Sequence, residues 1–200
     1  MGIPDFLQMD NELSFRGSNR YPHSLGLVLR LCLVLGIQPV FIPRGEPWRN
    51  GEIESFQDTF DKAFFRAQLF PSFKELCGEA PQFEDYHNEH YLYSCLKGKT
   101  PNQALREDSL GIVLLPGSFQ LPYGRIPIED GYIHFFRFIR SDRTLDIFGE
   151  PFTVSKELVY EYVKATICTG AHILQVRHDD QLVETFPYPL PRDIEGVNVS

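Results

Sequence analysis

The sequence of 200 residues contains only four cysteines, and none of them belongs to a Cys-x-x-Cys pair. Cys32, Cys77, Cys95 and Cys168 lie far apart in the sequence. The chain also lacks a secretory signal pattern and an apolar run of membrane-spanning length. We therefore expect a protein of the reducing cytoplasm that has no membrane partner.

Positive charge is also scarce, because the formal net charge is −8 at pH 7. Eleven Lys and Arg stand against thirteen Asp and Glu in residues 1–106, and eight stand against fourteen in residues 107–200. This balance argues against a protein that binds polyanions through bulk charge alone. The argument applies mainly to the second half, since the first half is close to neutral.

Hydrophobic residues make up 42% of the chain and aromatic residues 14%. This content is ample for a hydrophobic core, and the length allows one large or two small domains. The composition therefore predicts a globular protein and not a disordered one.

The first half is organised around two carboxylates, Asp10 and Glu54. The apolar run 6–9 predicts a strand that ends at Asp10, and a helix is predicted from about residue 24 to Gly36, which is a helix stop signal. A second strand is expected over 36–42. After a loop rich in Pro and Gly, a helix that begins near Gly51 and runs to about residue 69 would carry Glu54 in its first turn, where the helix dipole favours a negative charge.

These elements resemble, in order, the catalytic core of retroviral-type integrases and of DDE transposases from bacterial insertion sequences. The resemblance rests on Asp10-Asn11, Gly36-Ile37, Pro47 and the sequence from Asn50 to Glu54. It continues through Tyr86-His87-Asn88 and Gly98-Lys99-Thr100-Pro101 and covers about half of the chain. These elements in this order are far more specific than any one of them.

The resemblance implies an RNase H-like sheet on which Asp10 and Glu54 are the second and third acidic ligands of a two-metal site. The metal would be Mg²⁺ or Mn²⁺, and the two-ion site is expected only in the complete enzyme. By the same resemblance Asp10 and Glu54 are the catalytic residues, and DNA would be contacted by Asn11, Arg49, Asn50 and Lys99.

The sequence departs from the family pattern at three places. The family's first catalytic aspartate has no counterpart here, because Asp5 would share one strand with Asp10. The loop from Arg16 to Gly26 is longer than usual, whereas the interval from Gly36 to Glu54 agrees with the family. Asp58 and Asp61 stand where active relatives often carry basic residues, and a carboxylate repels phosphate. A solvated helix face explains these two residues equally well.

Residues 72–106 are predicted to form shorter helices over 72–77 and 81–91, followed by a polar connector over 102–108. His87 and His90, with Cys77 and Cys95 nearby, could imitate a zinc site, but their spacing fits no common structural zinc pattern. An exposed helix explains the same residues better.

From Leu110 onward short alternating runs predict strands, including 132–139, 144–147, 173–178 and 182–186, with tight turns at 141–143, 149–151 and 179–181. The pattern predicts a small closed barrel that resembles the Src-homology-3-like domain following many integrase cores. Phe135, Arg137 and Arg140 could contact DNA there, although ordinary strand residues explain Phe135 and Arg137 slightly better.

The expected fold class is thus α/β, a partial RNase H-like integrase core without its first strands, followed by a small all-β Src-homology-3-like barrel. The expected domains are residues 1–106 and residues 107–200.

The function implied is DNA integration or transposition by the C-terminal portion of a DDE transposase, which would transfer DNA strands when complete. Its expected partners are DNA (transposon ends and target) and an upstream transposase segment or full-length transposase, with a homo-oligomer in the complete enzyme. Whether the chain alone is an enzyme is left open. An inactive DNA- or transposase-binding module that regulates a full-length transposase is the main alternative, and an unrelated metal-dependent hydrolase is a weaker one.

Overall fold

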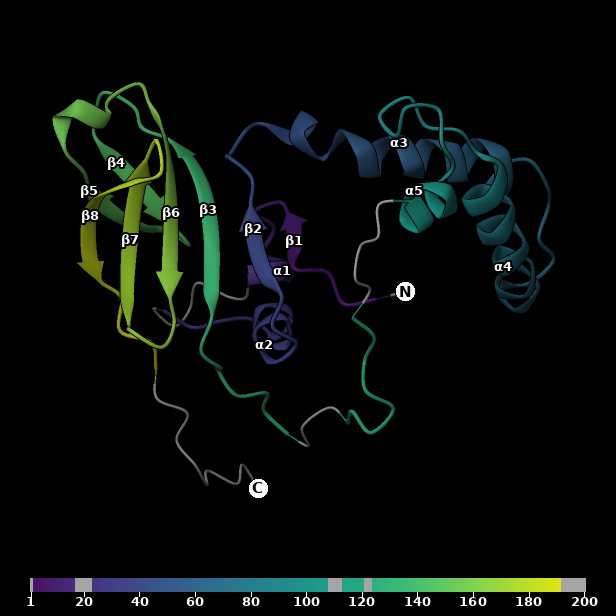
Figure 1. Ribbon diagram of the computed structural model, residues 1–200, viewed down its shortest axis with the longest axis horizontal. Helices are drawn as coiled ribbons and strands as arrows, with labels where there is room; N and C mark the ends of the chain where they lie inside the picture. The colour runs from purple at the N-terminus through teal and green to yellow at the C-terminus, as the bar shows by residue number, and fades with distance from the viewer. Residues whose placement is uncertain (1, 17–22, 108–112, 121–123, 192–200) are drawn as a thin grey trace. The chain divides into compact units, whose positions relative to one another are not determined.

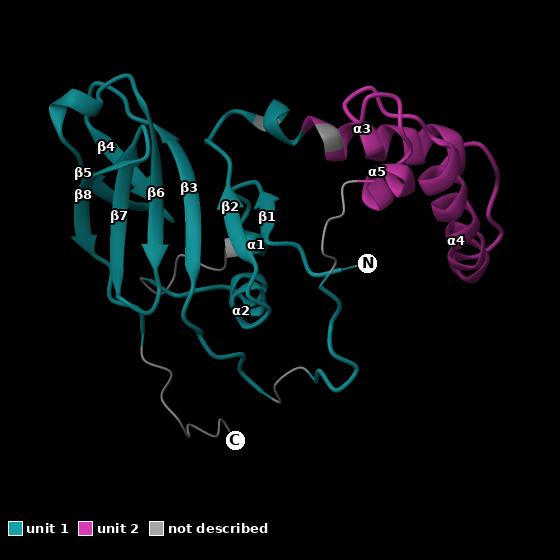
Figure 2. Cartoon of the chain, viewed as in Figure 1, with its two compact units in different colours: residues 1–50, 113–200 teal, residues 51–112 magenta. Residues whose placement is uncertain are grey.

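A computed structural model describes residues 2–16, 23–107, 113–120 and 124–191 (Figure 1). By their contacts the residues divide into two compact units, coloured separately in Figure 2. Unit 1 comprises residues 1–50 and 113–200, and unit 2 comprises residues 51–112.

Unit 1 is built on a six-stranded sheet of order β1-β2-β3-β6-β7-β8. The first three strands run parallel to one another, and the last three follow as antiparallel neighbours. A hairpin of two further strands and a short helical turn, η3 (Lys156–Leu158), lie between β3 and β6 in the chain (Figure 1). The strands are β1 (Phe6–Met9), β2 (Gln38–Phe41), β3 (Tyr132–Phe138), β4 (Thr144–Ile147), β5 (Glu150–Thr153), β6 (Tyr162–Cys168), β7 (Ile173–His178) and β8 (Gln181–Pro187).

One face of this sheet contributes its side chains to the hydrophobic core of unit 1. The strands alternate between buried and more exposed positions, as in Ile133, Phe135 and Arg137 of β3 against Tyr132, Phe136 and Phe138. The buried positions pack with helix α2 (Leu27–Val34) and with the β4–β5 hairpin. Helix α2 ends as predicted, because Gly36 adopts φ +72° and the next amide donates to the carbonyl of Cys32 at 2.8 Å.

Most strands predicted for the second half are confirmed. Residues 113–115, expected to end a first strand, form only an isolated bridge between Val113 and Ile3, and the turn expected over 149–151 lies at Phe148 and Gly149 because Glu150 already belongs to β5. Each of the hairpins β4–β5 and β7–β8 turns through two residues of positive φ, Phe148 with Gly149 and Asp179 with Asp180. Such turns match the twist of antiparallel strands. The local pattern was therefore sufficient to place these strands.

The closed barrel is not found among the described residues. Strand β3, which was expected to belong to the barrel, pairs in parallel with β2, and Phe41 stacks on Phe135 with ring centroids 5.1 Å apart. Because β3 takes β2 as one neighbour and β6 as the other, the strands form an open sheet with β1 and β8 at its edges. The contacts group residues 1–50 with 113–200, whereas the division into domains 1–106 and 107–200 stays a prediction about independent folding.

Unit 2 is helical and has an aromatic core. It contains α3 (Gly51–Phe60), a π-helical turn η2 (Asp61–Phe65), α4 (Phe73–His90) and α5 (Pro101–Glu107). Phe60, Phe64 and Phe83 meet with ring centroids 5.2–5.4 Å apart. Ser72 caps α4 by accepting from the amide of Glu75 at 3.2 Å.

Two local predictions in unit 2 are wrong. The helices expected over 72–77 and 81–91 form one continuous helix, α4, with Pro81 inside it. The aromatic contacts of Phe83 and His87 hold the second part of α4 against α3 in spite of the amide that Pro81 lacks. The expected polar connector from residue 102 is helix α5 up to Glu107, while residue 108 lies outside the described residues.

Within the described ranges, no helix combines the length and the apolar character that crossing a membrane requires.

Candidate active site

Asp10 lies directly after β1, at its carboxyl end, as the sequence predicted. Its side chain is half-buried, and its Oδ1 accepts a hydrogen bond from the amide of Glu12 at 3.0 Å. This bond starts the turn into the short helix α1 (Leu13–Arg16). The parallel pairing of β1 with β2 places Asp10 at the edge where open α/β sheets carry their sites.

Asn11 joins the ends of β1, β2 and β3. Its Nδ2 donates to the carbonyl of Ile42 at 2.8 Å, and its Oδ1 accepts from Nη2 of Arg137 at 2.6 Å. The amide is thus engaged within the chain on both sides. That Asn11 contacts DNA stays a prediction, but its observed contacts position Asp10.

Arg137 is the main residue of this site whose role the sequence did not reveal. It is 5% exposed and donates to the carbonyls of Ile42 at 2.9 Å and Asp146 at 3.2 Å. The guanidinium also lies 5.2 Å from the ring centroid of Phe135. A signal was present in the sequence, because residue 137 shares its strand face with apolar residues 133, 135 and 139. Neither Phe135, which is fully buried, nor Arg137 presents a side chain for DNA contact.

The loop after β2 is held by ionic and aromatic contacts. Glu46 accepts from Nε of Arg49 at 2.5 Å and from the hydroxyl of Tyr162 at 2.6 Å. These bonds, that of Tyr162 first, hold the pKa of Glu46 below its ordinary value. The Arg49 guanidinium also lies over the Tyr162 ring, 5.5 Å from its centroid. Binding of Arg49 to DNA, which stays a prediction, would compete with these contacts.

Asn50 is tied to the first strand. Gln8 donates from Nε2 to the Oδ1 of Asn50 at 3.1 Å and to the carbonyl of Arg49 at 2.9 Å. The structure thereby brings Asn11, Arg49 and Asn50 into unit 1 at the end of β1 and β2. That Arg49 and Asn50 bind DNA stays a prediction.

Glu54 lies in the first turn of α3 and is exposed. The acidic residues one and two turns further on form ion pairs with neighbouring cations. Asp58 pairs with Lys62 and Asp61 with Arg66, each at 2.7 Å. Much of the charge of the acidic stripe is therefore balanced within unit 2, which reduces the repulsion that the sequence alone suggested.

Asp10 belongs to unit 1 and Glu54 to unit 2. Their approach to each other stays a prediction. Among the residues that the structure describes, no three His, Cys, Asp or Glu side chains gather in a way that could hold a metal ion. Two carboxylates are too few for a two-ion site, so the described residues do not fit such a site by themselves.

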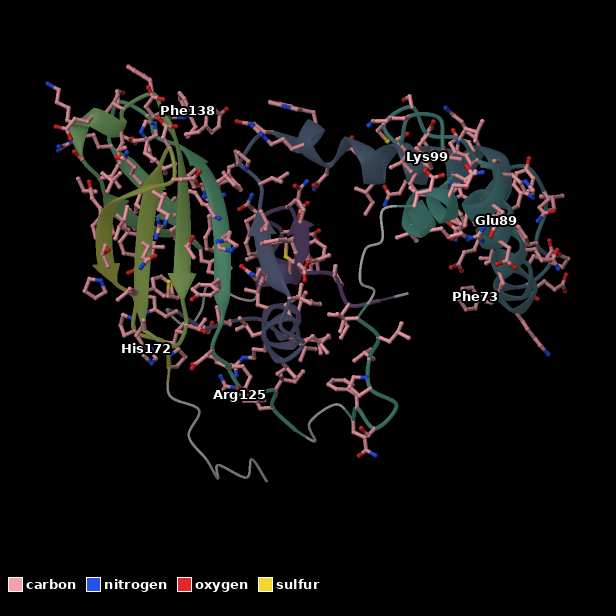
Figure 3. The ribbon with its side chains drawn as sticks, in the orientation of Figure 1. Phe73, Glu89, Lys99, Arg125, Phe138 and His172 are labelled. Atoms are coloured by element: carbon pink, nitrogen blue, oxygen red, sulfur yellow. The ribbon has the colours of Figure 1, made fainter. Side chains whose placement is uncertain are left out.

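Lys99, which is labelled in Figure 3, forms an ion pair with Glu107, the last residue of α5. The turn that carries it is built by Lys97 and Gly98, which adopt φ +57° and +78°. The next residue, Thr100, is 2% exposed and exchanges hydrogen bonds with Gln103, at 3.0 and 3.2 Å. The Gly-Lys-Thr-Pro element is thus the capped start of α5. That Lys99 contacts DNA stays a prediction.

Of the residues that could imitate a zinc site, only His87 belongs to the described core of unit 2. His87 is buried, and its Nε2 lies 2.7 Å from the Tyr93 hydroxyl. Cys77 and Cys95 are exposed free thiols. Nearby, Glu89 (Figure 3) binds Asn102 at 2.7 Å and Arg106 at 2.9 Å, which lowers its pKa, mainly through the bond from Asn102. These contacts fasten α5 to α4.

The sequence of residues 35–101 matches the model of the integrase core domain family. The matched segment includes Gly36-Ile37, the elements from Pro47 to Glu54, and Lys99-Thr100-Pro101, whereas Asp10 lies outside it. Comparison with curated proteins finds none that matches the chain. A match of this kind associates the segment, in general terms, with DNA integration and transposition and with DNA as a partner. Residues 35–101 are therefore similar in sequence to the integrase core domain, which is consistent with a transposase or integrase core.

Proposed function

We propose that the chain is the C-terminal portion of a DDE transposase or integrase and that it contributes to DNA strand transfer when the enzyme is complete. One observation carries this proposal. Asp10 lies at the carboxyl end of a parallel strand, and the segment that follows it in the chain matches the integrase core domain and carries Glu54 in the first turn of a helix. Asp10 and Glu54 are the proposed catalytic residues.

In this proposal a strand that precedes Asp10 in the complete enzyme supplies the third carboxylate. The exposed edge of β1 supports this step, because among the described strands β1 pairs only with β2. Phe6 and Leu7 of β1 are 56% and 38% exposed, which leaves apolar surface for a further strand to cover. With three carboxylates the site would hold Mg²⁺ or Mn²⁺, whose chemistry is to activate the attacking oxygen and stabilise the leaving one.

The test is a strand-transfer assay with pre-cut transposon ends and Mg²⁺ or Mn²⁺, with and without an upstream polypeptide that carries an aspartate. We expect no activity from the chain alone and activity from the mixture. Asp10→Asn and Glu54→Gln should each abolish it. Glu84→Gln, which removes a carboxylate from an exposed position of α4, is the matched control and should retain it. Strand transfer by the chain alone, or a fully active Glu54→Gln mixture, would contradict the proposal.

A second function, regulation of a full-length transposase by mixed assembly, is favoured by the same exposed edge of β1. It predicts that the chain binds the full-length protein and inhibits strand transfer even when both carboxylates are replaced. Retained inhibition by the Asp10→Asn, Glu54→Gln double variant would therefore support regulation over catalysis. Loss of inhibition would count against it.

A further inference from the structure

The face of the sheet opposite the core of unit 1 carries aromatic and cationic side chains. We call the alternate positions of β3, β6 and β7 on this side the outer face, and they include Tyr132, His134, Phe136, Lys164, Thr166 and Arg177. Tyr132 is 51% exposed and Phe136 40%, although both are large apolar rings. The row continues with Phe138, at the end of β3 (Figure 3).

Two cations lie side by side on the outer face. Lys164 and Arg177 are direct cross-strand partners, and Lys164 is also the partner of Phe136. Among the described residues neither cation forms an ion pair with a carboxylate, and Nη1 of Arg177 donates to the carbonyl of Asp180 at 3.0 Å. Like charges opposite each other destabilise a sheet, so an anion bound between them would be stabilising.

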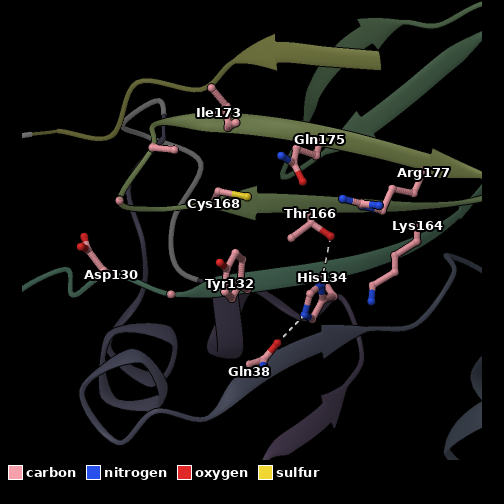
Figure 4. A pocket seen from close by; sticks show the side chains of 13 residues that line it. Gln38, Asp130, Tyr132, His134, Lys164, Thr166, Cys168, Ile173, Gln175 and Arg177 are labelled. Carbon is pink, nitrogen blue, oxygen red and sulfur yellow. Dashed lines mark hydrogen bonds between the residues drawn. The ribbon is translucent and has the colours of Figure 1, made fainter. Parts of the chain in front are cut away.

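A pocket of about 730 Å³ opens on this face (Figure 4). Its lining includes Tyr132, Lys164 and Arg177, and its floor is polar where His134 binds Thr166 at 3.0 Å and Gln38 at 2.8 Å. Among the described residues, Asp130 is the one carboxylate that lines the pocket. It precedes β3 and so lies near Cys168, at the opposite end of β6 from Lys164. The cationic end of the pocket therefore suits phosphate.

We infer that the outer face binds single-stranded nucleic acid, with bases stacked on Tyr132 and Phe136 and phosphates against Lys164 and Arg177. Tyr132 and Phe136 are four residues apart on β3, so their positions lie roughly 13 Å apart. Bases within a duplex repeat every ~3.4 Å along one strand. Rings at the wider spacing therefore suit a strand whose bases are unstacked from one another, as aromatic platforms for single strands require.

Binding is measured in EDTA, so it requires neither a metal ion nor strand transfer. Its outcome is therefore independent of the proposed function. Fluorescein-labelled oligodeoxyuridylate and oligouridylate of equal length are titrated with the full chain at low salt, and fluorescence anisotropy is recorded. We expect both to bind and a duplex of the same length to bind more weakly. Preference for one single strand would identify the sugar that the face accepts.

Replacement of the rings gives the sharpest test. Tyr132→Ala and Phe136→Ala should each weaken binding roughly tenfold. Tyr132→Phe should keep it, since stacking needs the ring and not the hydroxyl. Tyr160→Ala removes a ring that is 66% exposed elsewhere in unit 1 and should have no effect. Circular dichroism confirms that each variant is folded.

The cations are tested through the salt dependence of binding. Lys164→Gln and Arg177→Gln should each reduce the slope of log affinity against log salt by roughly 0.7. Lys156→Gln, at an exposed position in η3, should leave the slope unchanged. Absence of binding by the unaltered chain, tighter binding of duplex than of single strand, or binding that survives loss of both rings would overturn the inference.

Discussion

The buried guanidinium of Arg137 makes a direct prediction about how the candidate site is held in place. Arg137→Met preserves much of the side-chain volume but removes the donors to Oδ1 of Asn11 and to the carbonyls of Asp146 and Phe136. The carbonyl of Ile42 keeps its bond from Asn11, so it stays satisfied. Each acceptor left without a donor costs about 1–3 kcal/mol. Release from burying a charge offsets part of this loss. We expect a net destabilisation of about 2–4 kcal/mol.

The free energy of unfolding is measured by urea denaturation followed by far-ultraviolet circular dichroism. Arg140→Met, at an exposed arginine just beyond β3, is the matched control and should change it by less than about 0.5 kcal/mol. Asn11→Ala removes the other partner, so the double variant should be less destabilised than the sum of the single variants by about 1–3 kcal/mol. A neutral Arg137→Met, or additive effects, would refute the argument that these two residues act as a unit.

Two further predictions concern the same sheet. Burial, with a smaller contribution from Lys164, lowers the pKa of His134 from 6.5 to about 4. As the pH drops, His134 is therefore protonated in the unfolded chain before it is protonated in the folded one. The free energy of unfolding should fall by up to about 3 kcal/mol between about pH 6.5 and about pH 4. Urea midpoints at several pH values measure this, and His134→Gln should flatten the dependence; an equal dependence in that variant would assign it elsewhere. Gly131→Ala would place a Cβ 2.7 Å from Cδ2 of Leu33 and should cost about 1–3 kcal/mol in thermal or urea unfolding. Gly117→Ala, whose Cβ meets no atom within 4 Å, is its control, and equal stability of the two variants would contradict the packing argument.

Most helices and strands could be predicted from the sequence because their signals are local. The alternation of β3 and the positive-φ stop at Gly36 each depend on a few neighbouring residues. The pairing of β3 with β2 could not be predicted in this way. Alternation shows which face of a strand is apolar but not which strand lies beside it, and Phe41 and Phe135 are far apart in the sequence.

The candidate site was predictable to a similar extent. The placement of Asp10 after a strand and of Glu54 in the first turn of a helix followed from local pattern and from the family resemblance. The residues that fix the surrounding loops could not be predicted from local pattern. Tyr162 binds Glu46 from 116 residues away, and Arg137 binds Asn11 from 126 residues away. Such contacts depend on the tertiary fold, which no local pattern contains.

The central claim is that Asp10 and Glu54 converge, and a crosslinking experiment on the full chain tests it. The exposed thiols of Cys77 and Cys95 are replaced by serine, and cysteines are introduced as the pair Asp10→Cys and Glu54→Cys. The control pair is Asp10→Cys and Ser55→Cys, since the next residue of α3 points about 100° away around the helix.

Each pair is treated at low protein concentration with a short bifunctional thiol reagent, and intramolecular crosslinks are counted by mass spectrometry. Carboxylates that share one metal site require their backbones to approach closely, so the 10–54 pair should crosslink efficiently and the 10–55 pair poorly. Failure of the 10–54 pair to crosslink, or equal crosslinking of both pairs, would contradict the assignment of Asp10 and Glu54 to one catalytic site.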